Sequence, residues 1–131
     1  MNNKIRQANE RLKEFALSLP GAYEDHPWGE SVIKVNKKIF VFFGMSEDLE
    51  KRLSLGVKLP RTGEYAVDMP FVKPSGYGLG KHGWVDIELG PEDTLPEDLL
   101  LEWVEESYRA IAPKKLVAQL DEVRSGHDLY S

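Results

Sequence analysis

Lysine, histidine and tryptophan occur together in the segment Lys81-His82-Gly83-Trp84, and their side chains suit ligand binding. The ammonium group can contact a phosphate, the imidazole can titrate near neutral pH, and the indole can stack on a base. The same segment also suits a tryptophan that packs on a sheet with a solvated lysine beside it. Apolar and polar residues alternate over 83–89, so both interpretations place the cluster at the start of a strand.

Three glycines, Gly76, Gly78 and Gly80, precede this cluster. A phosphate-binding loop requires glycines that follow a strand and open a helix, so that helix amides point at the anion. Here the glycines come before a strand, and their spacing is not that of the dinucleotide-binding fingerprint. We therefore expect a conformationally demanding turn rather than a phosphate cradle.

A carboxylate adjoins an imidazole at Asp25-His26, and Ser31 is the nearest hydroxyl. The glycine pattern of a nucleophile elbow is missing around that serine, and the chain contains no cysteine. The three histidines lack the spacing of zinc ligands. The sequence therefore predicts no catalytic residue, metal or cofactor, and it favours a binding protein over an enzyme.

Basic side chains concentrate in the middle of the chain. Residues 31–83 carry nine basic and five acidic side chains, whereas residues 84–112 carry one basic and nine acidic. A positive strip on adjacent strands would track phosphates, although lysines at strand edges also discourage aggregation. Lys58 lies on the polar face of one such strand. The predicted nucleic-acid-binding residues are Lys34, Lys37, Lys38, Arg52, Lys81, His82 and Trp84.

A helix, a group of strands and further helices must position these residues. Residues 2–18 carry apolar side chains at helical spacing, and Pro20-Gly21 ends that pattern. Strands are predicted over 31–35, 38–43, 52–59 and 83–89, with a short helix near 62–68. Two further helices, separated by Pro113, follow Thr94-x-x-Glu97, which resembles a capping box.

Composition is typical of one globular domain that spans residues 1–131. Hydrophobic residues make up 41% of the chain and charged residues 30%, with a net charge of −5. The apolar runs are too short to cross a membrane, and no apolar segment follows the charged N-terminus. We expect a soluble cytoplasmic protein without a membrane partner, whose net acidity opposes generic binding to polyanions.

Several stretches of the sequence match the pattern of a known family. They are Leu19–Trp28, Val32–Phe43, Gly78–Trp84 and Leu101–Tyr108, followed by Pro113-Lys114-Lys115. Together they resemble the MmcQ/YjbR-like proteins over most of the chain. The resemblance implies a CyaY (frataxin)-like α+β fold: an N-terminal helix, an antiparallel sheet of about four to five strands, and C-terminal helices on one face.

The same resemblance implies DNA binding through a double-wing arrangement of loops and strands, and it supplies no catalytic residues. Lys81–Trp84 corresponds to the basic and aromatic start of a strand in the family. Members often have Gly-Gly between the first two strands, where this chain has Asn36-Lys37-Lys38. The turn is therefore more basic here than the family pattern implies.

Three functions stay open at this point, and the oligomeric state is not predicted. The first is nucleic-acid binding through the basic and aromatic residues above. The second is a small-ligand or enzymatic site lined by Tyr23, His26, Trp28 and Tyr77, with His82 beside them. The third is a protein partner on the acidic helix face, which otherwise is an ordinary solvated face. That face consists of Glu97, Asp98, Glu102, Glu105 and Glu106.

Overall fold

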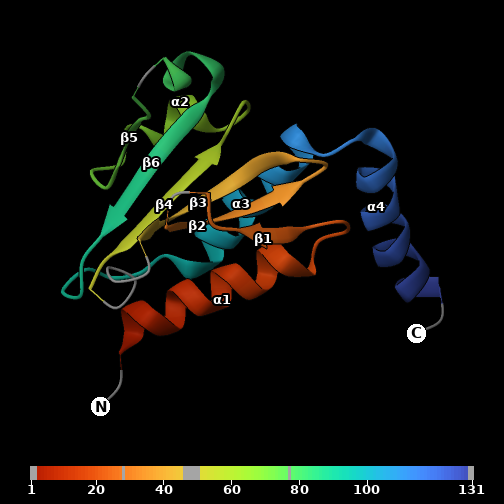
Figure 1. Ribbon diagram of the computed structural model, residues 1–131, viewed down its shortest axis with the longest axis horizontal. Coiled ribbons are helices and arrows are strands. Elements are labelled where there is room, and N and C mark those ends of the chain that lie inside the picture. The colour runs from red at the N-terminus through yellow and green to blue at the C-terminus, as the bar shows by residue number, and fades with distance from the viewer. Residues whose placement is uncertain (1–2, 28, 46–50, 77, 130–131) are drawn as a thin grey trace.

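The computed structural model describes residues 3–27, 29–45, 51–76 and 78–129 (Figure 1). The elements along the chain are α1 (Lys4–Ser18), β1 (Tyr23–Asp25), β2 (Glu30–Val35), β3 (Lys38–Met45), β4 (Leu53–Lys58), α2 (Gly63–Ala66), β5 (Val72–Pro74), the 3-10 helix η2 (Leu79–His82), β6 (Trp84–Leu89), α3 (Glu97–Ile111) and α4 (Lys114–Leu129). The strands form one antiparallel sheet in the order β1-β2-β3-β4-β6-β5. The predicted α+β fold, with a helix before the sheet and two after it, is confirmed.

Helix α1 shows how the sequence sets both the start of an element and the face that it buries. The side chain of Asn3 accepts a 3.0 Å hydrogen bond from the backbone N–H of Arg6, which is the role of an N-cap residue. Ile5, Ala8 and Leu12 are buried, and the helix contacts β2, β4 and α3. The helix ends at Ser18, before Pro20, close to the predicted boundary.

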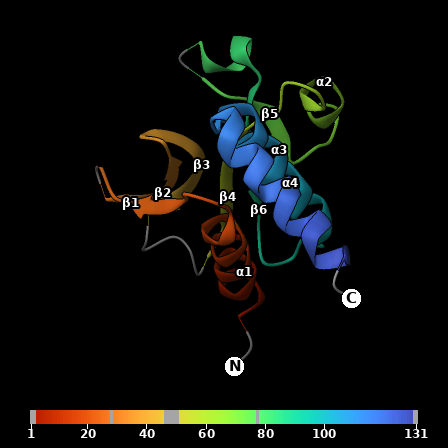
Figure 2. The same ribbon diagram turned by 90° about the vertical axis from the view of Figure 1, so that its right-hand side faces the viewer.

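The central strands bury every second side chain against the helices. Leu55 lies opposite Ile87, and Val57 lies opposite Val85, so the buried side chains of β4 and β6 share one face. Helices α1 and α3 cover this face, and Figure 2 shows them on the same side of the sheet. Helix α3 contributes Leu100, Trp103, Val104 and Tyr108 to the core. The alternation predicted from the sequence therefore identifies the buried face correctly.

A bulge in β3 fastens α3 to the sheet. Ile33 pairs with Val41 but Lys34 pairs with Ile39, so Phe40 is an extra residue on β3. Its side chain is buried and meets the ring of Tyr108 edge-on, with centroids 5.3 Å apart. The buried hydroxyl of Ser107 donates to the carbonyl of Phe40 at 2.6 Å and accepts from the backbone N–H of Lys58 at 2.8 Å. One α3 side chain thus joins two neighbouring strands.

The sheet has two strands more than the four that the sequence patterns indicate. Both edge strands, β1 and β5, contain only three residues each. Strands this short cannot show an alternating pattern, and β5 ends in Pro74, which fits an edge position because proline has no N–H to donate. No strand is therefore predicted from the sequence at either position.

The start of α3 also differs from the sequence pattern. The helix begins at Glu97 with Pro96 before it, and no side chain caps its backbone, so the predicted capping box is wrong. The Glu97 carboxylate instead forms an ion pair with Arg11 of α1. A contact between helices has replaced the local hydrogen bond that the pattern favoured.

Helix α4 packs against α3 and the residues that follow α1. Leu116 and Leu120 contact the core, and ion pairs join Arg109 to Asp121 and Arg124 to Glu105. No helix in the described ranges is both long enough and apolar enough to cross a lipid bilayer.

Candidate functional site

One end of the sheet gathers lysines from three separate segments. Because neighbouring strands are antiparallel, the start of β3, the end of β4 and the start of β6 lie together, and Lys58 pairs directly with Trp84. Lys37 lies in the β2–β3 turn at this end, Lys38 is the first residue of β3, and Lys81 lies in η2, just before β6. We call Lys37, Lys38, Lys58 and Lys81 the basic end.

The four lysines of the basic end lack a carboxylate partner among the residues that the structure describes. Lys37, Lys38 and Lys81 are exposed. Adjacent strands lie about 4.8 Å apart, so side chains from β3 to β6 span a distance comparable to a few phosphates.

Two other basic residues of the predicted interface lie elsewhere and are paired. The Lys34 ammonium is 2.8 Å from the Asp25 carboxylate, a hydrogen bond that raises the pKa of Lys34. Arg52 lies before β4, at the opposite end of the sheet, and contacts Glu88 at 3.0 Å. The predicted set is therefore divided: Lys37 and Lys38 of the β2–β3 hairpin and Lys81, His82 and Trp84 of the η2–β6 segment lie toward one end of the sheet, whereas Lys34 and Arg52 are paired with carboxylates.

The β2–β3 turn holds Lys37 in a backbone conformation that is unfavourable for lysine. Asn36 has φ +51° and Lys37 has φ +68°, so both turn residues are left-handed. Asparagine tolerates this conformation, but the second position of such a hairpin turn strongly favours glycine. A lysine at a position that favours glycine suggests that its side chain has a use.

The glycine run forms the demanding turn that its composition predicted. Gly78 (φ +79°) and Gly83 (φ +89°) lie immediately before and after η2. A Cβ atom on Gly83 would lie 3.4 Å from backbone atoms of Leu59 and Pro60, and the Gly83 carbonyl accepts a 2.8 Å hydrogen bond from the Leu59 N–H. The turn therefore fixes Lys81 and His82 beside the end of β4.

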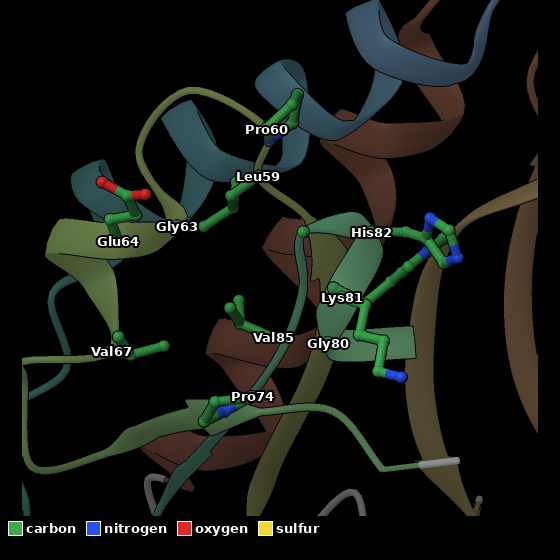
Figure 3. Close-up of a pocket in the computed structure, with 12 residues that line it drawn as sticks. Leu59, Pro60, Gly63, Glu64, Val67, Pro74, Gly80, Lys81, His82 and Val85 are labelled. Atoms are coloured by element: carbon green, nitrogen blue, oxygen red, sulfur yellow. The ribbon is translucent and has the colours of Figure 1, made fainter. Parts of the chain in front are cut away.

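A groove of 470 Å³ lies between α2 and the η2–β6 segment. Leu59, Val67, Pro74 and Val85 form its apolar part. In Figure 3, Lys81 and His82 extend to the same side of η2, whereas Glu64 and Val67 lie across the groove. Lys81 and His82 line this groove and are exposed.

An aromatic pair accompanies the lysines. The rings of Trp84 on β6 and Phe42 on β3 meet at an interplanar angle of 71°, with centroids 5.5 Å apart. Both side chains are partly exposed on the sheet face opposite α1 and α3. Phe42 was not predicted as a site residue, because the bulge at Phe40 breaks the alternation that would have separated the two faces of β3.

Of the alternative pocket residues, the described Tyr23 and His26 are separated from His82 by three strands of the sheet. Tyr23 and His26 belong to β1 and the residue after it, whereas His82 precedes β6, with β2, β3 and β4 between them in the sheet. Trp28 and Tyr77 lie outside the described residues. Among the described residues, no group of three histidine, cysteine or carboxylate side chains is placed to hold a metal ion.

His26 belongs to a polar cluster around Glu24 that ties β1 to α1. One Glu24 oxygen lies 2.6 Å from the Ser31 hydroxyl, 2.9 Å from the Lys13 ammonium and 3.1 Å from the His26 imidazole. Partial burial raises the pKa of Glu24, but the hydrogen bonds from Ser31 and Lys13 outweigh it, and the pKa falls below its ordinary value. Because the Ser31 hydroxyl donates to the carboxylate and not to the imidazole, the cluster lacks the order of a catalytic triad.

The acidic face of α3 is largely used within the protein. Glu106 accepts hydrogen bonds from the backbone N–H groups of Arg61 and Thr62. Glu105 is held by Arg124 and Arg109, whose hydrogen bonds lower its pKa despite partial burial. With Glu97 bound to Arg11, exposed Asp98 and Glu102 are what is left for a partner.

A family model described as YjbR matches residues 17–110, which covers well over half of the chain. No protein of curated function matches the sequence.

Proposed function

Because the chain belongs to the YjbR family, we propose that it is a small nucleic-acid-binding protein that contacts phosphates through the basic end of its sheet. The observation that carries this proposal is the placement of Lys37, Lys38, Lys58 and Lys81, which come from three segments, lie toward one end of the sheet and have no acidic partner in the described ranges. A structural lysine usually acquires such a partner, as Lys34 does.

The physical basis of the binding is the release of counterions. Each lysine that neutralises a phosphate frees a condensed cation, so affinity falls steeply as salt is added. Four contacts imply a slope of log affinity against log salt of about −3.6, which is roughly a hundredfold loss between 50 and 200 mM salt. The net charge of −5 restricts binding to this one end of the molecule.

Two carboxylates of α3 are engaged by groups other than the lysines of the basic end. Glu106 is engaged by the backbone N–H groups of Arg61 and Thr62, and Glu105 by two arginines. The lysines are instead displayed on a turn and on strand ends, where they are free to reach a ligand. This arrangement favours a nucleic acid over a second protein as the partner.

Charge reversal at the β2–β3 turn tests the proposal. In a Lys37→Glu/Lys38→Glu variant, anisotropy titrations with a labelled DNA oligonucleotide should show weaker binding, and the salt slope should become shallower by about 2. The matched control is Lys51→Glu/Arg52→Glu, which makes the same change in net charge at the opposite end of the sheet.

The control variant also asks whether Arg52 contributes, as the sequence suggested. Equal weakening by both double variants would mean that net charge, and not the basic end, controls binding. Absence of any binding by the wild-type protein at low salt would sink the proposal outright.

A further inference from the structure

The sheet face opposite α1 and α3 carries an exposed aromatic surface. Phe42, Gly56 and Asp86 lie side by side across β3, β4 and β6, and Trp84 lies one step further toward the basic end. Val32, next to Phe42 on β2, is completely buried. On β2 this face is therefore closed beside Phe42, whereas on β5 the exposed Lys73, the partner of Asp86, continues it.

Gly56 leaves room for the Phe42 ring to lie across β4. A Cβ atom on Gly56 would lie 3.2 Å from the Cβ of Phe42 and 3.4 Å from its ring. The Phe42 ring therefore leans over the glycine toward Trp84, and their edge-to-face contact bridges the strand between them. A shallow depression of 200 Å³ continues along the face beside Phe42, with Ser54, Lys73 and Asp86 on its walls.

Charge is distributed unevenly along the same face. Lys58 is the cross-strand partner of Trp84, and Lys81 precedes it by three residues. The carboxylates lie further along β6: Asp86 accepts a 2.7 Å hydrogen bond from Ser75, and Glu88 is paired with Arg52. An anionic strand is thus favoured at the Trp84 end and disfavoured toward Glu88.

We propose that this open face binds unpaired bases, which stack on Trp84 and Phe42 while the basic end holds the adjoining phosphates. This inference rests on the proposed function and specifies its ligand as single-stranded nucleic acid. Bases of a duplex are stacked on one another and hide their faces, whereas an unpaired strand can lay them on aromatic side chains of a sheet. The polar walls of the depression would meet base edges.

A comparison of ligands tests the proposal with the wild-type protein alone. Oligothymidine, an abasic strand of the same length and a duplex of that length offer similar phosphates but different access to bases. We expect oligothymidine to bind roughly tenfold or more tightly than the abasic strand, and more tightly than the duplex. Equal affinity for the first two, or preference for the duplex, would overturn the proposal.

A variant then locates the stacking site. Trp84→Leu keeps an apolar side chain on the face but removes the indole, and it should weaken oligothymidine binding about tenfold while leaving abasic-strand binding unchanged. Phe42→Leu should act in the same direction. Thermal unfolding of each variant identifies any loss of fold, and in that case the ligand comparison above decides the question by itself.

The two proposals fail in different ways. If Lys37→Glu/Lys38→Glu weakens binding but Trp84→Leu and removal of the bases have no effect, the phosphate contacts are supported and base stacking is refuted. Failure of the wild-type protein to bind any of the three ligands would refute both.

Discussion

Lys37 combines an exposed ammonium group with a backbone conformation that a lysine disfavours. At φ +68° its Cβ is crowded by the neighbouring carbonyl, a cost of roughly 1–2 kcal/mol for a residue other than glycine. The sequence predicted a basic turn at this position. It did not predict the left-handed conformation of Lys37, because the turn type depends on how β2 and β3 pair. Similarly, the composition of the glycine run predicted a special backbone, but not which glycines would be left-handed.

Replacing Lys37 with glycine should separate stability from binding. Lys37→Gly relieves the left-handed strain and should raise the free energy of unfolding by about 1 kcal/mol, measured by urea denaturation. The same variant should bind DNA more weakly, because one phosphate contact is lost. Asn36→Gly is the matched control, because asparagine already tolerates the left-handed conformation. If Asn36→Gly stabilised the protein as much as Lys37→Gly does, the backbone strain assigned to Lys37 would be contradicted.

At the scale of elements, the long amphipathic segments were predictable and the short ones were not. The patterns of α1, β4 and β6 identified both their extents and their buried faces. The three-residue strands β1 and β5 are too short for any periodicity, and the bulge at Phe40 shifts the alternation of β3 in its middle. These features depend on the neighbouring strand and helix, and so a local pattern does not encode them.

The Ser107 hydroxyl of α3 joins β3 to β4 through two hydrogen bonds to their backbones. Ser107→Ala leaves the Phe40 carbonyl and the Lys58 N–H without their partner in a buried place, and should cost about 2 kcal/mol of unfolding free energy. Ser18→Ala, which removes an exposed hydrogen bond to the Phe15 carbonyl, should change stability little. Similar values for the two variants in chemical denaturation would show that Ser107 does not clamp the bulge.

At the scale of the whole molecule, the basic side chains fall into two groups, one available to a ligand and one that holds helices together. The lysines of the basic end form no ion pair with the described residues, whereas Arg109 and Arg124 form ion pairs that hold α4 to α3. Total charge is therefore a poor guide to binding here, because most acidic groups of α3 act inside the protein. The sequence could show the uneven distribution, but not which charges were already paired.

Acid should loosen the α3–α4 contact. Arg124 and Arg109 lower the pKa of Glu105, and Arg109 lowers that of Asp121. Because its pKa is lowered on folding, ionised Glu105 stabilises the folded protein. This contribution is complete above 4.5, the ordinary pKa of the group, and it is lost as the pH falls through the lowered pKa of the folded state. Urea denaturation should show this loss in the wild-type protein, and a smaller one in Glu105→Gln. Glu102→Gln, exposed on the same helix, should follow the wild-type curve, and a flattened curve for it would contradict the assignment.

The edges of the sheet bear on how copies of this protein would occupy a long nucleic acid. Both edge strands are only three residues long, and one of them ends in a proline. Short edges of this kind offer few free backbone groups to another sheet. Strand pairing between neighbouring copies would therefore be limited to about three residues at each edge, which favours independent occupation of the nucleic acid over a filament joined through its sheets.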